Sequence, residues 1–97
     1  MTSSPGTANE DPLAARRRRL NFRASHRGTK EADILIGGFC ARHSATWSEA
    51  EIAWFESLLE ETDVDIMAWA IGTQPVPARY SHDLMDAMQR LDYLNAD

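Results

Sequence analysis

The chain has 97 residues, so it forms one small domain whose core has little room for a large internal cofactor. Its single cysteine excludes an intrachain disulfide and fits a reducing compartment, and no run approaches the ~18 apolar residues that a membrane span needs. Because residues 1–12 also lack the apolar segment of a secretory signal, we expect a cytoplasmic protein without membrane insertion.

The net charge of −5 conceals a strong asymmetry along the chain. Residues 12–30 carry seven basic side chains and no acid, whereas residues 31–97 carry thirteen acids against three arginines. Either the two halves attract one another or the basic end binds an acidic partner. The run from Arg16 to Arg19 leaves a nucleic-acid-binding module open as an alternative. An acidic body without a stripe of basic and aromatic residues argues against stable nucleic-acid binding.

The N-terminal residues 1–12 are polar and contain two prolines, which predicts a disordered tail ahead of a domain at 13–97. A first helix is expected from Leu13 to His26, with Leu20 and Ala24 at core spacing. Gly28 is the natural C′ residue, since glycine adopts a left-handed conformation without a Cβ clash.

Thr29 is expected to cap a second helix over residues 30–43, whose apolar stripe contains Ile34, Leu35, Gly38 and Phe39. The Gly37-Gly38 pair inside this helix costs roughly 1 kcal/mol per glycine relative to alanine. The cost indicates close approach of another helix, although a backbone surface offered to a partner stays open as an alternative.

Three further helices complete the prediction. Thr46 and Glu49 have the form of a capping box before a helix with a core face at positions 52, 55, 58 and 59. Asp63 is expected to cap residues 64–71, which Gly72 ends, with positions 66, 69 and 70 facing inward. After an extended connection with two prolines, Ser81 is expected to cap a last helix carrying Leu84, Met85, Met88 and Leu91. The sequence therefore predicts an all-α fold, a small five-helix bundle.

Catalytic and cofactor motifs are absent from the sequence. Cys40 and His43 stand three positions apart, but two ligands make a poor zinc site, and a buried thiol beside a helix-terminal histidine explains them better. His26 and His82 have no nucleophile nearby in the sequence, and no phosphate-binding glycine motif occurs. We expect neither an enzyme nor a resident cofactor or metal.

Recognition is the function that the segment Arg27-Gly28-Thr29-Lys30-Glu31 favours. It lies where the first two helices meet, so a cation and an anion project from a glycine corner. The candidate partner-binding residues are Arg27, Gly28 and Glu31. Each also has a local explanation, because Arg27 complements a helix C-terminus, Gly28 ends a helix and Glu31 favours the next N-terminus.

This segment resembles the RGxxE signature of the succinate dehydrogenase assembly factor 2 family, called SdhE in bacteria. The resemblance extends over residues 13–94 through four further blocks in the same order: 16–20, 54–59, 63–69 and 74–77. Two positions depart from the usual family pattern, with Thr29 where Met is common and His26 where Arg or Lys is frequent.

The resemblance implies a chaperone-like factor that binds the flavoprotein subunit of succinate dehydrogenase, or of fumarate reductase, and promotes covalent attachment of FAD to that subunit. It implies that Arg27, Gly28 and Glu31 contact the partner and that this chain is not itself the catalyst. A plain oligomerisation domain is the remaining alternative from another class.

Overall fold

The structure, a computed structural model, describes residues 11–95, and all regular elements within them are helical. The α-helices are α2 (Pro12–Ser25), α3 (Lys30–Ala32), α4 (Gly38–His43), α5 (Glu49–Leu58), α6 (Asp63–Ile71) and α7 (Asp83–Arg90). A π-helical turn, Asp33–Gly37, joins α3 to α4 without a break, and short 3₁₀ turns occupy Ser44–Thr46, Ala78–Tyr80 and Asp92–Asn95. The described residues thus form five helical segments and no strand, which confirms the predicted all-α class.

The predicted N-terminal tail lies outside the described residues except for its last two positions. Asp11 and Pro12 begin α2: the Asp11 carboxylate accepts a hydrogen bond from the Leu13 amide at 2.9 Å, and Pro12 occupies the first turn. Proline suits this position, because its fixed φ is helical and its missing N–H would have had no partner. The helix therefore starts one residue before the predicted boundary. At the other end, residues 96 and 97 of the predicted domain lie outside the described part.

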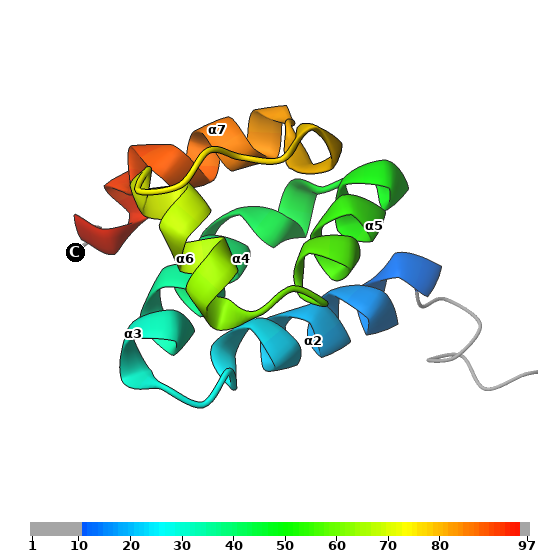
Figure 1. The fold of residues 1–97 in the computed structure, drawn as a ribbon. Coiled ribbons are helices and arrows are strands. Elements are labelled where there is room, and N and C mark those ends of the chain that lie inside the picture. The colour runs from blue at the N-terminus through cyan, green and yellow to red at the C-terminus, as the bar shows by residue number, and fades with distance from the viewer. Residues whose placement is uncertain (1–10, 96–97) are drawn as a thin grey trace, which may run out of the picture.

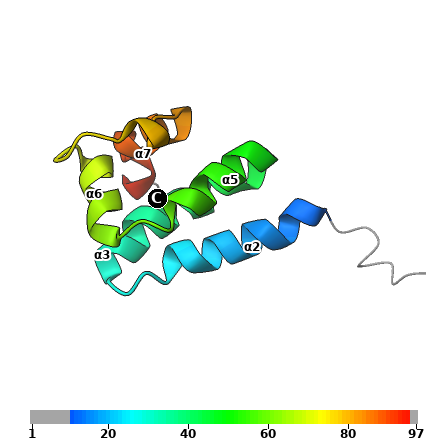
Figure 2. The same cartoon turned by 45° about the vertical axis from the view of Figure 1, so that its right-hand side comes forward.

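The five helical segments pack around one core (Figures 1 and 2). In both views α2 lies along one side and α7 along the opposite side, with α4 and α5 between them. The turn from α2 into α3 stands at one end of the molecule, beside the beginning of α6. This end carries the segment that the sequence marked for recognition.

Three predicted caps are displaced by one or two residues. The capping box is formed by Ser48 and Glu51, not by Thr46 and Glu49: the Ser48 amide donates to the Glu51 carboxylate at 2.7 Å. Thr62 caps α6 in place of Asp63, and His82 caps α7 in place of Ser81. Ser48 and Thr62 cap with a side-chain oxygen, as the predicted residues would have done, whereas His82 accepts from the Leu84 amide through its ring Nδ1 at 3.0 Å. For α5 the choice follows from Trp47, which is buried in extended backbone and so delays the helix.

Glycine at position 37 is explained by the predicted close approach of a helix. A Cβ there would lie 2.8 Å from the Cα of Ser25, at the end of α2, which no packing tolerates. Gly38 is less demanding, because its Cβ would make an ordinary 3.6 Å contact with the Tyr93 ring. The π-helical turn at this crossing was not predicted.

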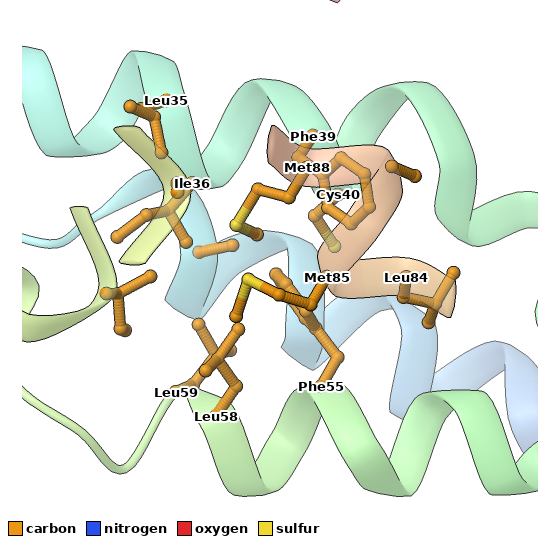
Figure 3. Close-up of a cluster of buried hydrophobic side chains, with 14 of the residues drawn as sticks. Leu35, Ile36, Phe39, Cys40, Phe55, Leu58, Leu59, Leu84, Met85 and Met88 are labelled. Carbon is orange, nitrogen blue, oxygen red and sulfur yellow. The ribbon is translucent and has the colours of Figure 1, made fainter. Parts of the chain in front are cut away.

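The core is a single cluster to which the central segment, α5 and α7 contribute most of the large side chains (Figure 3). Phe39, Phe55, Ile36, Met85 and Met88 are fully or almost fully buried there. The predicted core positions of α5 and α6 are buried as expected. Leu20 and Ala24 are the buried residues of α2, also as expected.

Arginines of α2 bind the acidic half of the same chain. The Arg16 guanidinium donates to both oxygens of Glu56, at 2.8 and 3.1 Å, and Arg23 pairs with Glu60 at 2.7 Å. Arg17 donates to the backbone carbonyls of Ser44 and Trp47 at 3.1 and 2.7 Å. The charge asymmetry is therefore satisfied largely within the chain, which is the first of the two interpretations offered by the sequence.

Candidate functional site

The corner between α2 and α3, residues 26–31, is built around the backbone of Gly28. His26 ends α2 as its C-cap, and Gly28 follows two residues later with φ of 118°. Thr29 then returns to extended backbone, and its hydroxyl accepts from the Ala32 amide at 3.2 Å to start α3. The positive φ confirms the need for glycine, although Gly28 is the second residue after the C-cap and not the first, C′, as predicted. A Cβ at Gly28 would meet no atom within 4 Å, so the corner is open to its surroundings.

Arg27 turns toward the protein at this corner. Its Nε donates to Oδ1 of Asp63 at 2.6 Å, and one Nη donates to the backbone carbonyl of Glu61 at 3.1 Å. The Asp33 carboxylate accepts from the Arg27 amide as well. Only 12% of the Arg27 side chain is exposed. The guanidinium thus fastens the corner to the connection between α5 and α6.

Glu31 has the opposite character. It lies exposed in the first turn of α3, and it forms no hydrogen bond or ion pair with any residue that the structure describes. Gly28, Thr29 and Lys30 are exposed as well. The three residues predicted to bind the partner therefore lie together at one corner. Arg27 faces the protein, whereas Gly28 and Glu31 face the solvent.

Exposed apolar side chains surround the corner on three elements. Phe22 lies on the last turns of α2, Ile34 on the turn after α3, and Val64 in the first turn of α6, next to Asp63. Ile34 had been predicted in the core stripe, but 51% of it is exposed. The reason is the π-helical turn, which changes the angle between successive residues, so that Leu35, Ile36 and Phe39 face the core without it.

Sequence reasoning did not single out Phe22 or Val64. A signal existed for Phe22, because it is an aromatic residue inside a basic run and lies off the face defined by Leu20 and Ala24. No comparable signal existed for Asp63 as the partner of Arg27, since the two are separated by 36 positions.

The Cys40 and His43 pair is structural. Cys40 is fully buried, and that burial raises the pKa of its thiol to about 11. His43 ends α4 with its ring 4.7 Å from that of Phe39. Within residues 11–95, no three His, Cys, Asp or Glu side chains gather where a metal ion could be held.

Comparison with known proteins assigns the chain to a protein family. Residues 18–92 match the family model described as "Flavinator of succinate dehydrogenase". The chain belongs to this family. The match includes the whole corner and also Asp63, so both sides of the Arg27 contact lie within the family domain.

Named relatives agree with this assignment. The chain is 44% identical over 87 residues to the FAD assembly factor SdhE of Acetobacter pasteurianus, which covers 90% of this chain and 80% of that protein. It is 34% identical over 83 residues to succinate dehydrogenase assembly factor 2, mitochondrial, of Drosophila virilis, covering 84% and 52% of the two chains. The corresponding mitochondrial protein of Saccharomyces cerevisiae strain YJM789 is 35% identical over 82 residues, covering 81% and 51%.

The chain spans about half the length of these mitochondrial relatives.

The family match and the named relatives confirm the resemblance inferred from the RGxxE segment, which is to an assembly-factor family of succinate dehydrogenase. In the described part of the chain, no helix is both long and apolar enough to cross a membrane.

Proposed function

We propose that this protein binds the flavoprotein subunit of succinate dehydrogenase, or of the related fumarate reductase, and promotes covalent attachment of FAD to it. Support comes from the family match and from the names of its relatives, which refer to flavin assembly and succinate dehydrogenase. The observation that carries the proposal is the corner itself: an exposed segment, Gly28 to Glu31, held in place by the inward contacts of Arg27.

Positioning is the contribution that a small binding protein can make to such a reaction. The flavin supplies the difficult chemistry of attachment, and the residue to which it becomes joined belongs to the partner. Correct alignment of reacting groups contributes up to roughly 7–11 kcal/mol in intramolecular reactions, so a protein that only orders the partner can change the rate greatly. Catalytic groups of its own are not required.

The corner residues divide this task. Gly28 has no side chain, so the partner backbone can approach closely, and Glu31 offers a carboxylate to donors on the partner. Arg27 acts indirectly, by positioning Gly28 and Glu31. Its hydrogen bonds to Asp63 and to the Glu61 carbonyl fix the angle between α2 and α3. In this scheme the partner-binding residues are Gly28 and Glu31 by contact and Arg27 by position.

The test is a flavinylation assay with purified flavoprotein subunit, free FAD and this protein, read by covalent flavin fluorescence after denaturing electrophoresis. Glu31→Gln is expected to lower the rate at least tenfold. Asp86→Asn is the matched control, because Asp86 is also an exposed acid in the first turn of a helix, α7, on the opposite side of the molecule from α2. If the wild-type protein leaves the rate unchanged, the proposed function is wrong. Equal loss in both variants would remove Glu31 from the site.

A further inference from the structure

A shallow hollow of about 370 Å³ lies on the outer face of α2, lined by Arg18, Arg19, Phe22 and Arg23. Phe22 stands four positions after Arg18 and three after Arg19, and Arg23 stands four after Arg19, so these side chains are neighbours on the helix surface. Phe22, the one aromatic residue that lines the hollow, is 63% exposed. Phe22 is outside the buried core and shares a hollow with three arginines, and it is this combination that makes the hollow a candidate binding surface.

The Phe22 ring is held in a fixed orientation. It stacks on His26 with ring centroids 4.0 Å apart and planes 20° apart. The imidazole is anchored in turn, because its Nδ1 lies 2.7 Å from the Phe22 carbonyl oxygen, and a carbonyl only accepts, so Nδ1 carries the proton. A ring that is already ordered loses little conformational entropy when a partner covers it.

The rim of the hollow is positive. Arg19 is exposed and forms no ion pair with any described residue, and Arg23 stays 40% exposed although it pairs with Glu60. The aliphatic stems of these arginines add apolar surface beside the ring while their charged ends remain in water. The chemistry that complements such a hollow is an apolar side chain flanked by carboxylates.

The hollow also continues the surface of the corner. Phe22 stacks directly on His26, the residue before Arg27, and the rise along α2 from Arg18 to its last residue, Ser25, is only about 10 Å at 1.5 Å per residue. A partner that covers Gly28 and Glu31 can therefore reach Phe22 without leaving the same end of the molecule.

We propose that the hollow binds an acidic segment of the flavoprotein partner, with an apolar side chain of that segment against Phe22 and a carboxylate at Arg19. This inference rests on the proposed function and adds a second contact to it. It also assigns a role to basic side chains of α2 other than Arg16 and Arg17, which are bound within the chain by an ion pair to Glu56 and a hydrogen bond to the Trp47 carbonyl.

The experiment is a binding titration of purified flavoprotein subunit at two salt concentrations with five variants, of which Glu31→Gln reports on the corner and the other four on the hollow and its control. Phe22→Ser is expected to weaken binding at least tenfold and Phe22→Tyr less than threefold. Arg19→Glu is expected to weaken binding about tenfold in low salt and distinctly less in high salt, because exposed charge pairs are screened. Ile71→Ser is the control: Ile71 is a similarly exposed aliphatic residue at the far end of α6, and its removal leaves binding unchanged.

Each outcome has a definite meaning. Wild-type protein that binds no flavoprotein subunit overturns the proposed function and this inference with it. Wild-type affinity in Phe22→Ser and Arg19→Glu, with loss in Glu31→Gln, overturns the inference alone. A Phe22→Ser variant that changes only self-association, measured by sedimentation, shows that the hollow binds a second copy and also overturns it. Melting temperatures of all variants verify that they are folded.

Discussion

Two turns of this molecule each contain a glycine with positive φ and have an arginine nearby. They differ in how deeply that arginine is buried. Gly28, after α2, and Gly72, after α6, both have positive φ, and a Cβ on either would meet no atom within 4 Å. An arginine near each turn reaches the region between α5 and the start of α6. Arg27, directly before Gly28, contacts Asp63, and Arg79, in the 3₁₀ turn beyond Gly72, contacts Glu61. The two arginine side chains are 12% and 65% exposed. The first turn is therefore held against the body of the protein by a largely buried arginine, whereas the arginine beyond the second turn remains largely exposed.

Burial decides how much each arginine contributes to the stability of the fold. Exposed ion pairs add little to stability, because water and salt screen the charges and two flexible side chains must be ordered. Removal of one member of a largely buried pair leaves its partner without compensation. The difference shows that the α2–α3 corner is held by a largely buried arginine contact, whereas the corresponding contact of Arg79 lies largely in water.

The largest expected effect is on Arg27. We expect Arg27→Ala to destabilise the fold by about 2 kcal/mol, because it leaves Asp63 and the Glu61 carbonyl without a donor. In a domain of this size that lowers the melting temperature by about 10 °C. Arg79→Ala, the matched change at the second turn, leaves the melting temperature nearly unchanged. Thermal unfolding followed by circular dichroism measures both, and equal losses would refute the distinction between the two turns.

The second prediction separates folding from binding at the glycines. Gly28→Val and Gly72→Val each force a Cβ into a left-handed backbone at a cost of ~1–2 kcal/mol, so both variants fold with similarly reduced stability. Binding of the flavoprotein subunit is lost only in Gly28→Val, because a side chain there blocks the open corner. Pull-down of the subunit with each folded variant decides the matter: retention by Gly28→Val would exclude the corner as a contact surface.

The third prediction concerns acid. Hydrogen bonds from Tyr80, at 2.6 Å, and from Arg79 lower the pKa of the Glu61 carboxyl. Because the folded pKa lies below the unfolded value of about 4.3, the stabilisation is fully present above that value and is lost as pH falls through the folded pKa. Tyr80→Phe is therefore expected to lower the melting temperature more at pH 7 than at pH 3. A difference from wild type that does not vary with pH would show that the Tyr80–Glu61 bond is not formed in solution.

The smallest expected effect is none at all. Incubated alone with FAD, this protein is expected to form no covalent flavin adduct and no tight complex, since residues 11–95 contain no sheet or glycine motif to hold a dinucleotide. His26 is the residue to examine, because it lies exposed beside the corner. Mass spectrometry of the incubated protein provides the measurement. A flavin adduct at His26 would indicate a flavin carrier and not an assembly factor.

Local patterns in the sequence predicted what depends on local geometry. Helical spacing identified the buried faces of α5 and α6, and the positive φ of Gly28 and Gly72 followed from their places after helices. The caps were displaced because adjacent residues such as Thr62 and Asp63 offer the same chemistry, and backbone packing chooses between them.

The candidate site was predicted in part for the same reason. Glu31 and Gly28 are outward, as a corner between two helices requires. The inward direction of Arg27 depends on where the connection between α5 and α6 passes, which no pattern near residue 27 contains. The exposure of Ile34 depends on a π-helical turn at the crossing with α2, where Gly37 meets Ser25. Both are consequences of tertiary packing.

Because Cys40 is buried, its rate of chemical labelling reports on transient opening of the hydrophobic core. The thiol is the single one in the chain, and with a pKa of about 11 it is almost entirely protonated at neutral pH. Thiolate is the reactive form, so an alkylating reagent modifies Cys40 only when the core opens. The labelling rate thus measures the free energy of opening without any added probe. Compared with and without the flavoprotein subunit, it also reveals whether complex formation tightens the helices behind the corner.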